Sequence, residues 1–442
     1  MNKPSVFVST ALMIAAVVVI CGCAGPSGER ATLTAAGEAA TPLRTPTPLQ
    51  EPPVEAATPG ALVLSTRTVT AQSGVPMPGV SAANRSLLDF SFPSGSSGWM
   101  LGFDGNTFIW HTADGGGTWT RIDIDERGRQ PSSIQFVDDV HGWIWFPVSC
   151  TAAPNCTQWL LSTSDGGKSW REMVIAADTM STPQFVDPLH GWLPVRCDES
   201  CTPASESSTL LPGVRLLATS DGGATWNYVR SCEAPSPRCY PSGGRRFGAD
   251  AGLFRARPAP GGPVVGWSRL ITPDAGASWL EIPLPCGASF DPSAFFILAP
   301  STYWTICSQD EGPQFYRELY GSEDGGSTWH LRSAGRSLNQ ARPTPVAGIG
   351  VLPYGGSQIY FDDTSNGWLW GFCCHGGAIS KIFATHDGGR NWIEQKLPVP
   401  SPMIVDPILQ PVGPGRLRVF ADGLLYATDD YGATWQRLLL PP

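Results

Sequence analysis

The sequence has few charged residues and no extended helical pattern. Only 15% of its 442 residues are charged, and its formal net charge is -9. No long stretch places apolar residues at positions i, i+3, i+4 and i+7, which argues against a helical protein. Basic clusters are also missing, since Arg245 and Arg246 form only an isolated surface pair in a glycine-rich stretch. We therefore expect no nucleic-acid partner, because phosphate backbones are bound by clustered Lys and Arg.

Motifs of common catalytic and metal centres are absent as well. The chain contains no Gly-x-Ser-x-Gly elbow, no phosphate-binding loop and no His-Glu-x-x-His helix. Its cysteines do not repeat the Cys-x-x-Cys spacing of zinc knuckles. We expect no cofactor and no metal ion, and the sequence favours a protein that is not an enzyme.

The N-terminal residues predict export. Lys3 precedes an apolar run over residues 6–20 that is short for a bilayer span and typical of a secretory signal. The residues that follow are rich in Ala, Thr, Pro and Glu, a composition that stays extended. We expect a signal peptide over 1–22, a tether over 23–60, and a strand and loop over 61–87, in which residues 62–70 alternate like a strand.

Ten cysteines remain after Cys21 and Cys23, and an even number in an exported chain suggests disulfides. A vicinal bond between Cys373 and Cys374 would be strained. A zinc site is the alternative reading of these cysteines. The expected disulfide residues are three close pairs, Cys150 with Cys156, Cys197 with Cys201 and Cys232 with Cys239, and one distant pair that could join consecutive repeats, Cys286 with Cys307.

One eight-residue motif recurs seven times after residue 88. Its first copy runs from Thr112 to Trp119, and each copy has the form Thr/Ser-x-Asp-x-Gly-x-Ser/Thr-Trp, with Asn391 replacing the second hydroxyl residue in the sixth. The Asp carboxylate can accept backbone N–H bonds and the Gly can adopt positive φ, so each copy predicts a tight hairpin turn. The Trp is expected to pack between repeats. The motif aspartates, 43 to 63 residues apart, are Asp114, Asp165, Asp221, Asp274, Asp324, Asp387 and Asp430.

A second element supports the same repeat. Residues 135–143 match residues 184–192 and, more loosely, residues 360–368. Each copy begins with Gln-Phe or Tyr-Phe, continues through an Asp-containing turn and ends with Gly-Trp. Gly98-Trp99 and Gly266-Trp267 are interpreted as further copies, whereas Trp304 lacks the Gly and the last repeat lacks the Trp.

A period near 40–50 residues with four strands per repeat predicts an all-β fold, a seven-bladed β-propeller of four-stranded antiparallel blades over 88–442. The last outer strand lies at the C-terminus, so ring closure needs no N-terminal strand, although residues 62–70 could pair there. We expect a monomer.

The seven Asp motifs resemble the Asp-box, or bacterial neuraminidase repeat, of sialidases, sortilin-type receptors, xyloglucanase-type glycosidases and photosystem II stability/assembly factor-like proteins. The last family is the most similar in style, because its blades also pair a Gly-Trp strand with such a turn. The resemblance implies a propeller with a protein-binding surface. It does not identify the partner, because the ten cysteines and the Pro/Thr-rich tether depart from that family.

The residues around Cys23 resemble the lipobox of bacterial lipoproteins, in which the Cys is lipidated and becomes the new N-terminus. That resemblance implies that Cys23 anchors the protein to the outer face of a bacterial membrane. The alternative is an ordinary signal peptide that contains Cys.

Most candidate site residues have a structural interpretation. Asp138, Asp187 and Asp362 are predicted to open first turns, and the repeated His141 and His190 to cap them rather than to bind metal. His375 beside Cys374 has no further ligands at suitable spacing. The arginine-containing residues 254–258 do not match the sialidase arginine element, which precedes the first Asp-box.

Two functions follow from these expectations. The first is a lipid-anchored, extracytoplasmic protein that binds or helps assemble another protein or an envelope component. The second is a carbohydrate-active propeller, either a sialidase-like or other glycoside hydrolase or a lectin-like glycan binder, with its site at the central channel.

Overall fold

A computed structural model shows a protein built from β-strands. In the part of the chain that it describes, all regular elements are strands, and no helix is long and apolar enough to cross a bilayer. The described residues are 63–73, 86–124, 128–147, 157–176, 179, 181–196, 214–231, 239–241, 252–258, 264–272, 278–287, 289–311, 314–338, 350–352, 358–371, 381–398, 407–421 and 424–438.

After β1 (Val63–Ser73), the strands form successive groups of four, each an antiparallel meander. The first two groups are β2 (Ser86–Ser91), β3 (Gly98–Phe103), β4 (Thr107–Thr112) and β5 (Thr120–Ile124), then β6 (Ser133–Phe136), β7 (Gly142–Phe146), β8 (Thr157–Thr163) and β9 (Ser169–Ala176). The next two are β10 (Gln184–Phe185), β11 (Gly191–Arg196), β12 (Val214–Thr219) and β13 (Asn227–Ser231), then β14 (Cys239–Pro241), β15 (Gly252–Pro258), β16 (Val264–Ile271) and β17 (Leu280–Pro283).

The fifth group is β18 (Asp291–Ala299), β19 (Thr302–Glu311), β20 (Gln314–Ser322) and β21 (His330–Leu338), to which β22 (Gly350–Val351) adds in parallel. The last two are β23 (Gln358–Phe361), β24 (Gly367–Gly371), β25 (Lys381–Thr385) and β26 (Ile393–Glu394), then β27 (Ile408–Gly413), β28 (Arg416–Ala421), β29 (Leu424–Thr428) and β30 (Gln436–Leu438). Each outer strand begins within a residue of the motif Trp, as expected.

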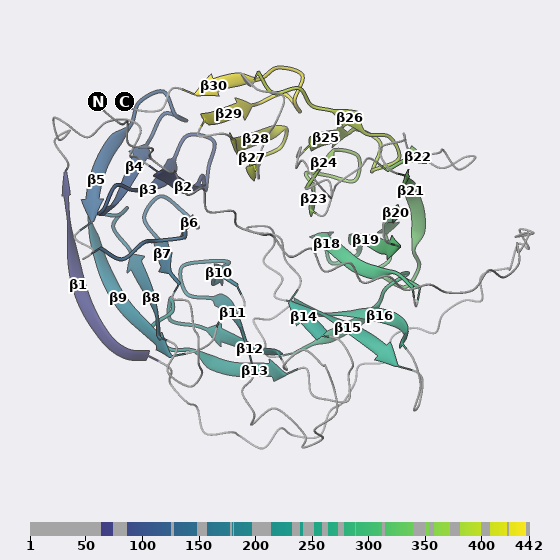
Figure 1. The fold of residues 1–442 in the computed structure, drawn as a ribbon, viewed down its shortest axis with the longest axis horizontal. Helices are drawn as coiled ribbons and strands as arrows, with labels where there is room; N and C mark the ends of the chain where they lie inside the picture. The colour runs from purple at the N-terminus through teal and green to yellow at the C-terminus, as the bar shows by residue number, and fades with distance from the viewer. Residues whose placement is uncertain are drawn as a thin grey trace, which may run out of the picture. The chain divides into compact units, whose positions relative to one another are not determined.

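These strands form six sheets, not the seven separate sheets expected. The difference is due to β1, which pairs antiparallel with β9 along Val63–Thr70 and with β5 along Ala71–Ser73. β1 thereby joins β2–β5 and β6–β9 into one nine-stranded sheet, and it lies along both outer strands in Figure 1. It therefore covers outer edges of the two blades that follow it, where unpaired backbone groups are available, instead of pairing at ring closure.

Neighbouring blades are joined by aromatic stacks built from the Phe and Gly-Trp of the second repeated element. Trp143 on β7 stacks on Phe185 in the next blade, with ring centroids 3.7 Å apart and planes 3° apart. The same stack recurs in two other joints, at 3.8 Å for Trp99 with Phe136 and at 3.9 Å for Trp304 with Phe361.

The conserved spacing of this element has a packing reason. Gln135 donates from Nε2 to the Phe185 carbonyl at 2.7 Å and accepts from the Phe185 N–H at 2.9 Å, which bridges the inner strands β6 and β10. A Cβ on Gly142 would lie 2.5 Å from the Phe136 ring. Gly is therefore needed where the Phe of the inner strand crosses the second strand of its own blade.

The last blade contacts the first blade and closes the ring. Gln410 on β27 donates to the Phe92 carbonyl at 2.9 Å and accepts from the Phe92 N–H at 2.8 Å, across 318 residues of sequence. Leu438 packs with Phe90 and Leu425 in an apolar cluster shared by the two blades. The ring of four-stranded antiparallel blades makes the chain a β-propeller (Figure 1).

One detail of the expected blade is corrected. Gly266-Trp267 lies on β16, the third strand of its blade, whereas β15 is the second. In the second repeated element, a Phe and an Asp-containing first turn come directly before the Gly-Trp pair. Neither comes directly before Gly266-Trp267, so the dipeptide alone did not identify the second strand of this blade. The expected covalent link is present: Cys286, after β17, forms a disulfide with Cys307 on β19, so it joins consecutive blades.

Candidate functional site

Six of the seven motif aspartates lie in the described residues, and their turns share one hydrogen-bond pattern. In the turn of Asp165, the Thr163 hydroxyl donates to the carboxylate at 2.8 Å and accepts from the Gly167 N–H at 2.9 Å. The Ser169 N–H and hydroxyl donate to the two carboxylate oxygens at 2.9 and 2.5 Å. We call these the Asp turns; the other five are those of Asp114, Asp221, Asp324, Asp387 and Asp430.

The backbone of the Asp turn uses two consecutive residues of positive φ, where the sequence indicated one. In the second blade these are Gly166 and Gly167, with φ of 76° and 88°. In the last blade Tyr431, with φ of 57°, takes the first position. Asn391 preserves the pattern, because its side-chain amide donates to Asp387 at 2.7 Å in place of a hydroxyl.

These hydrogen bonds determine the acidity of the turn carboxylates. The Thr118 N–H, with the Thr112 and Thr118 hydroxyls, lowers the pKa of Asp114 to about 2. Burial raises the pKa of Asp165, but the hydrogen bonds from Ser169 and Thr163 outweigh it and the net pKa is lowered. A carboxylate that is ionised and already bonded on both oxygens is poorly suited to proton transfer at neutral pH. The Asp turns are therefore scaffold.

In the second and third blades, the first turn is capped by an Asp and a His within the turn. Asp138 accepts from the N–H groups of Val140 and His141, and its carboxylate contacts Nδ1 of His141 at 2.8 Å. Asp187 and His190 make the equivalent contacts. In the described residues no group of three or more His, Cys, Asp and Glu is placed to hold a metal ion.

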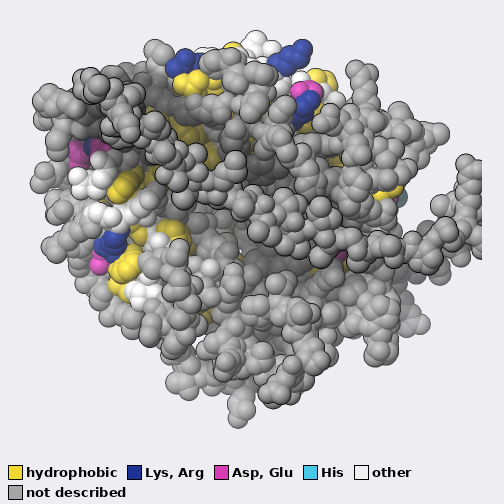
Figure 2. Space-filling model, in the orientation of Figure 1, with side chains coloured by type: hydrophobic (Ala, Val, Ile, Leu, Met, Phe, Trp, Pro, Cys, Tyr) yellow, Lys and Arg dark blue, Asp and Glu magenta, His cyan; other side chains and the backbone are white. Residues whose placement is uncertain are grey.

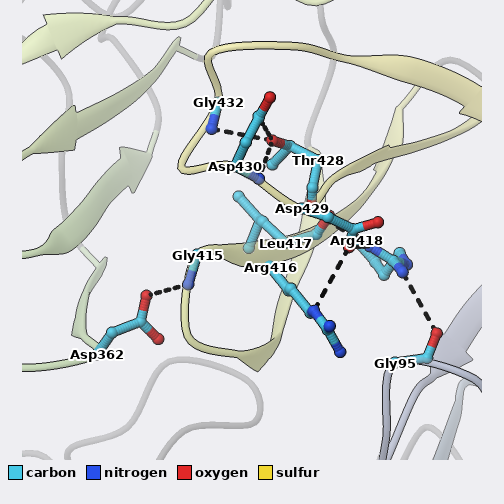
Figure 3. Close-up of polar contacts among 10 residues, drawn as sticks. All are labelled: Gly95, Asp362, Gly415, Arg416, Leu417, Arg418, Thr428, Asp429, Asp430 and Gly432. Carbon is cyan, nitrogen blue, oxygen red and sulfur yellow. Dashed lines mark hydrogen bonds and ion pairs between the residues drawn. The ribbon is translucent and has the colours of Figure 1, made fainter.

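The expected turn role of Asp362 is corrected. Its neighbour Asp363 caps that turn, accepting from the Asn366 N–H at 2.7 Å and the Asn366 side chain at 2.8 Å. Asp362 instead accepts from the Gly415 N–H of the last blade at 2.9 Å (Figure 3). Burial raises the pKa of Asp362. The repeat already distinguishes the two aspartates, because aligning residues 360–368 with 135–143 places Asp363, and not Asp362, at the position of Asp138.

Both kinds of turn lie at one end of the blades. The Gly166 N–H in an Asp turn donates to the Val140 carbonyl at 3.0 Å, and the Gly222 N–H donates to the Leu189 carbonyl at 2.9 Å. Val140 and Leu189 are exposed at 41% and 53%, so two neighbouring blades present an aliphatic side chain at this end. We call this end the turn face.

The last blade carries a group of charged residues at the turn face. The guanidinium of Arg418, a buried residue, donates to Asp429 at 3.0 Å and to the Gly95 carbonyl of the first blade at 3.4 Å. Figure 3 shows these contacts beside the Asp turn of Asp430 and Thr428. Arg416 lies 4.0 Å from the same Asp429 carboxylate. These charges hold two blades together.

A tyrosine–glutamate pair, the arrangement that a sialidase-like nucleophile needs, is present on β20. The Tyr320 hydroxyl donates to Glu318 at 2.8 Å. Burial, reinforced by Glu318, raises the pKa of Tyr320, which keeps its proton in place. β20 is the third strand of its blade, and Tyr320 packs against the apolar cluster around Trp267 and the disulfide.

The described basic and acidic side chains do not form separate patches. On the face drawn in Figure 2, basic and acidic side chains lie beside one another, with hydrophobic ones among them. Arg121, for example, bonds both Asp104 and Asp123, at 2.9 and 2.6 Å.

Several expectations fall outside the described residues. These are the signal peptide, the tether, Cys23, Asp274 and His375, together with the side chains of Cys150, Cys156, Cys197, Cys201, Cys232, Cys239, Cys373 and Cys374. Three connections that contain such cysteines run from Phe146 to Thr157, from Arg196 to Val214 and from Gly371 to Lys381. Each leaves the end of a second strand, and second strands run away from the turn face because the blades are antiparallel.

Sequence reasoning missed the residues that join blades. Gln135 and Gln410 belong to inner strands and bridge to the next blade, and the repeated Gln before Phe was a usable signal for the first of them. Arg418 had no sequence signal, because it stands where the other blades have Trp.

No protein-family description and no curated protein matches this sequence. Among solved structures, YCF48 bound to D1 peptide has 15% identity and a TM-score of 0.44, covering 84% of this chain and 99% of that one. A GH74 xyloglucanase from Xanthomonas campestris has 14% identity and a TM-score of 0.33, covering 80% and 67%. A polysaccharide lyase of family PL25, an ulvan lyase, has 10% identity and a TM-score of 0.42, covering 76% and 90%. These likenesses are too distant to assign a family or an activity.

Proposed function

We propose that this chain is an exported, lipid-tethered propeller of seven Asp-box blades that binds another protein, or an envelope component, and helps to assemble or stabilise it without catalysing a reaction. The nine-stranded sheet counts as two blades, since β2–β5 and β6–β9 are each a complete meander with its own Asp turn. With the five other sheets this makes seven. The shared hydrogen bonds of the Asp turns support the Asp-box assignment.

The observation that carries the proposal is that the repeated acidic residues have structural roles. The carboxylates that repeat along the chain accept hydrogen bonds within their own turns, which leaves them structural. Asp89, on the first inner strand, is buried and accepts from the Ile134 N–H at 2.9 Å, so it too serves a joint between blades. The repeated acidic residues therefore stabilise the ring, and we place the binding function on a surface of the propeller.

The end opposite the turn face is the better candidate for that surface. Three second strands end there before long connections, for example the one between Arg196 and Val214, whereas the first turns of the second, third and sixth blades are five residues long and alike. Variable connections on a rigid scaffold are the usual carriers of binding.

The alternative is a carbohydrate-active propeller, for which the Tyr320–Glu318 pair is the specific observation. The raised pKa of Tyr320 and its position on a third strand count against a nucleophilic role.

The binding proposal is tested by cross-linking the native full chain in intact cells and purifying it from detergent-solubilised membranes. We expect one protein in stoichiometric amount, with cross-links concentrated in peptides flanking residues 147–156 and 197–213. Cleavage of artificial glycosides together with retention of glycans alone would overturn the proposal in favour of the alternative.

The anchor is tested separately with Cys23→Ala, which should move the protein from the membrane fraction to the soluble exported fraction. A Cys21→Ala variant is the matched control and should stay with the membrane. Retention of both variants would contradict lipidation at Cys23.

A further inference from the structure

We propose that the ring opens at the joint between its last and first blades, with the last blade β27–β30 moving as a unit. The inference rests on how this joint is built. It does not depend on the proposed function.

The pair of side chains that meets between the two blades differs from the Trp–Phe stack of the aromatic joints. In strand register, Arg418 lies opposite Gln410 just as Trp143 lies opposite Gln135. Arg418 therefore occupies the Trp position, and its guanidinium lies over the Phe92 ring at 5.8 Å, where three other joints have rings stacked at 3.7 to 3.9 Å.

The joint also has no covalent or shared-strand closure. All four strands of the last blade come from one stretch, residues 408–438, and the N-terminal strand β1 pairs with β5 and β9 instead. The joint between the fourth and fifth blades, which lacks the stack as well, is held by the Cys286–Cys307 disulfide. Among the described residues, the last-to-first joint is held by noncovalent contacts, and its two blades come from stretches far apart in the sequence.

The contacts that cross this joint combine the polar contacts of Gln410 and Arg418 with an apolar cluster that the two blades share. Gln410 bonds the Phe92 backbone, and Arg418 bonds the Gly95 carbonyl (Figure 3). Phe90 and Phe420 pack at 6.4 Å beneath them. The other partner of Arg418, Asp429, is 48% exposed, so water and salt reach this ion pair. A buried guanidinium whose acidic partner is half exposed stabilises a joint less than a packed aromatic ring does, so this joint is the one expected to open first. A partner that touches both blades would favour the closed ring by mass action.

The test is native-state hydrogen exchange of the full chain, read by mass spectrometry at increasing denaturant. Peptides from β2 and from β27–β30 should exchange together, and before those from β6–β9, by at least tenfold. Arg418→Trp restores an aromatic pair on Phe92 and should slow exchange of the last blade toward that of β6–β9. The matched variant Trp143→Arg should create a second early-opening joint at β7 and β10.

Simultaneous exchange of all blades in the native chain would overturn the inference, as would an unchanged order of exchange in a folded Arg418→Trp variant. If that variant does not fold, Gln410→Ala provides the second test. It should speed exchange of β2 and β27–β30 alone, and uniform acceleration in every blade would refute the proposal.

Discussion

The Gly before the joint Trp is a packing requirement, and Gly142→Ala tests it. The added Cβ would lie 2.5 to 2.6 Å from three carbons of the Phe136 ring. Ordinary contact needs about 3.5 Å, so the ring must shift by about 1 Å. It cannot shift freely, because its other face is stacked at 3.8 Å on Trp99 of the preceding blade.

Overpacking of a fixed core costs about 1–3 kcal/mol, and a ring confined on both faces places this case near the upper end. At about 2.1 cal/mol/K of unfolding entropy per residue, a cost of about 3 kcal/mol in a protein of this size lowers Tm by about 3 °C. Tm is measured by calorimetry on the full chain. The matched control is Gly287→Ala, since no atom lies within 4 Å of its Cβ, and it should leave Tm unchanged.

A rescue variant separates steric conflict from loss of backbone flexibility. Replacing Phe136 with Leu in the Gly142→Ala background should cost less than the two single changes added together, because the smaller side chain removes the conflict. Equal Tm for Gly142→Ala and Gly287→Ala, or strict additivity in the double variant, would show that the reasoning is wrong.

Three further predictions concern turns and the disulfide. The folded pKa of Asp114 is lowered to about 2, below its ordinary value of 3.8, so its contribution to stability is complete above about pH 4 and is lost as pH falls toward 2. Thermal melts between pH 7 and pH 2 should show a plateau in Tm followed by a decline at low pH. A Tm that begins to fall above pH 5 would contradict this. Thr163→Val leaves the buried Gly167 N–H without its acceptor and should cost about 1–3 kcal/mol in denaturant unfolding, whereas Thr163→Ser should cost little. Cys286→Ser with Cys307→Ser removes a bond spanning 21 residues and should cost about 3 kcal/mol, and reductant should lower the Tm of the native chain by more than that of the double variant.

The fold was predictable because its repeat is a local signal. An Asp, a Gly and hydroxyl residues at fixed offsets specify one turn, and six copies in the described residues fold into it. The β1 pairing was not predictable in the same way. Its partners, β5 and β9, lie 50 to 110 residues away and are bound through backbone groups, which leave no side-chain signature.

The errors have a common physical cause, which is that a joint between blades is a relation between two segments. Gly266-Trp267 has the right dipeptide but lies on a third strand, and Asp362 is one residue away from the capping position. Arg418 is the opposite case, a joint residue that matches no repeat. Strand register, which fixes what each residue faces in the next blade, identifies the true positions of Trp267 and Arg418, and strict alignment of the repeat identifies that of Asp362.

The same reasoning bears on where a function can lie. A residue that packs between blades or closes a turn is constrained by its neighbours, so Gln135, Phe136 and Asp138 serve the scaffold in every blade that has them. Positions that depart from the repeat are therefore the ones that can indicate a function or a motion. In the described residues they gather where the last blade meets its neighbours, at Asp362, Arg418 and Tyr431, which is why the ring-closing joint, and not one of its regular copies, is the place to look for motion.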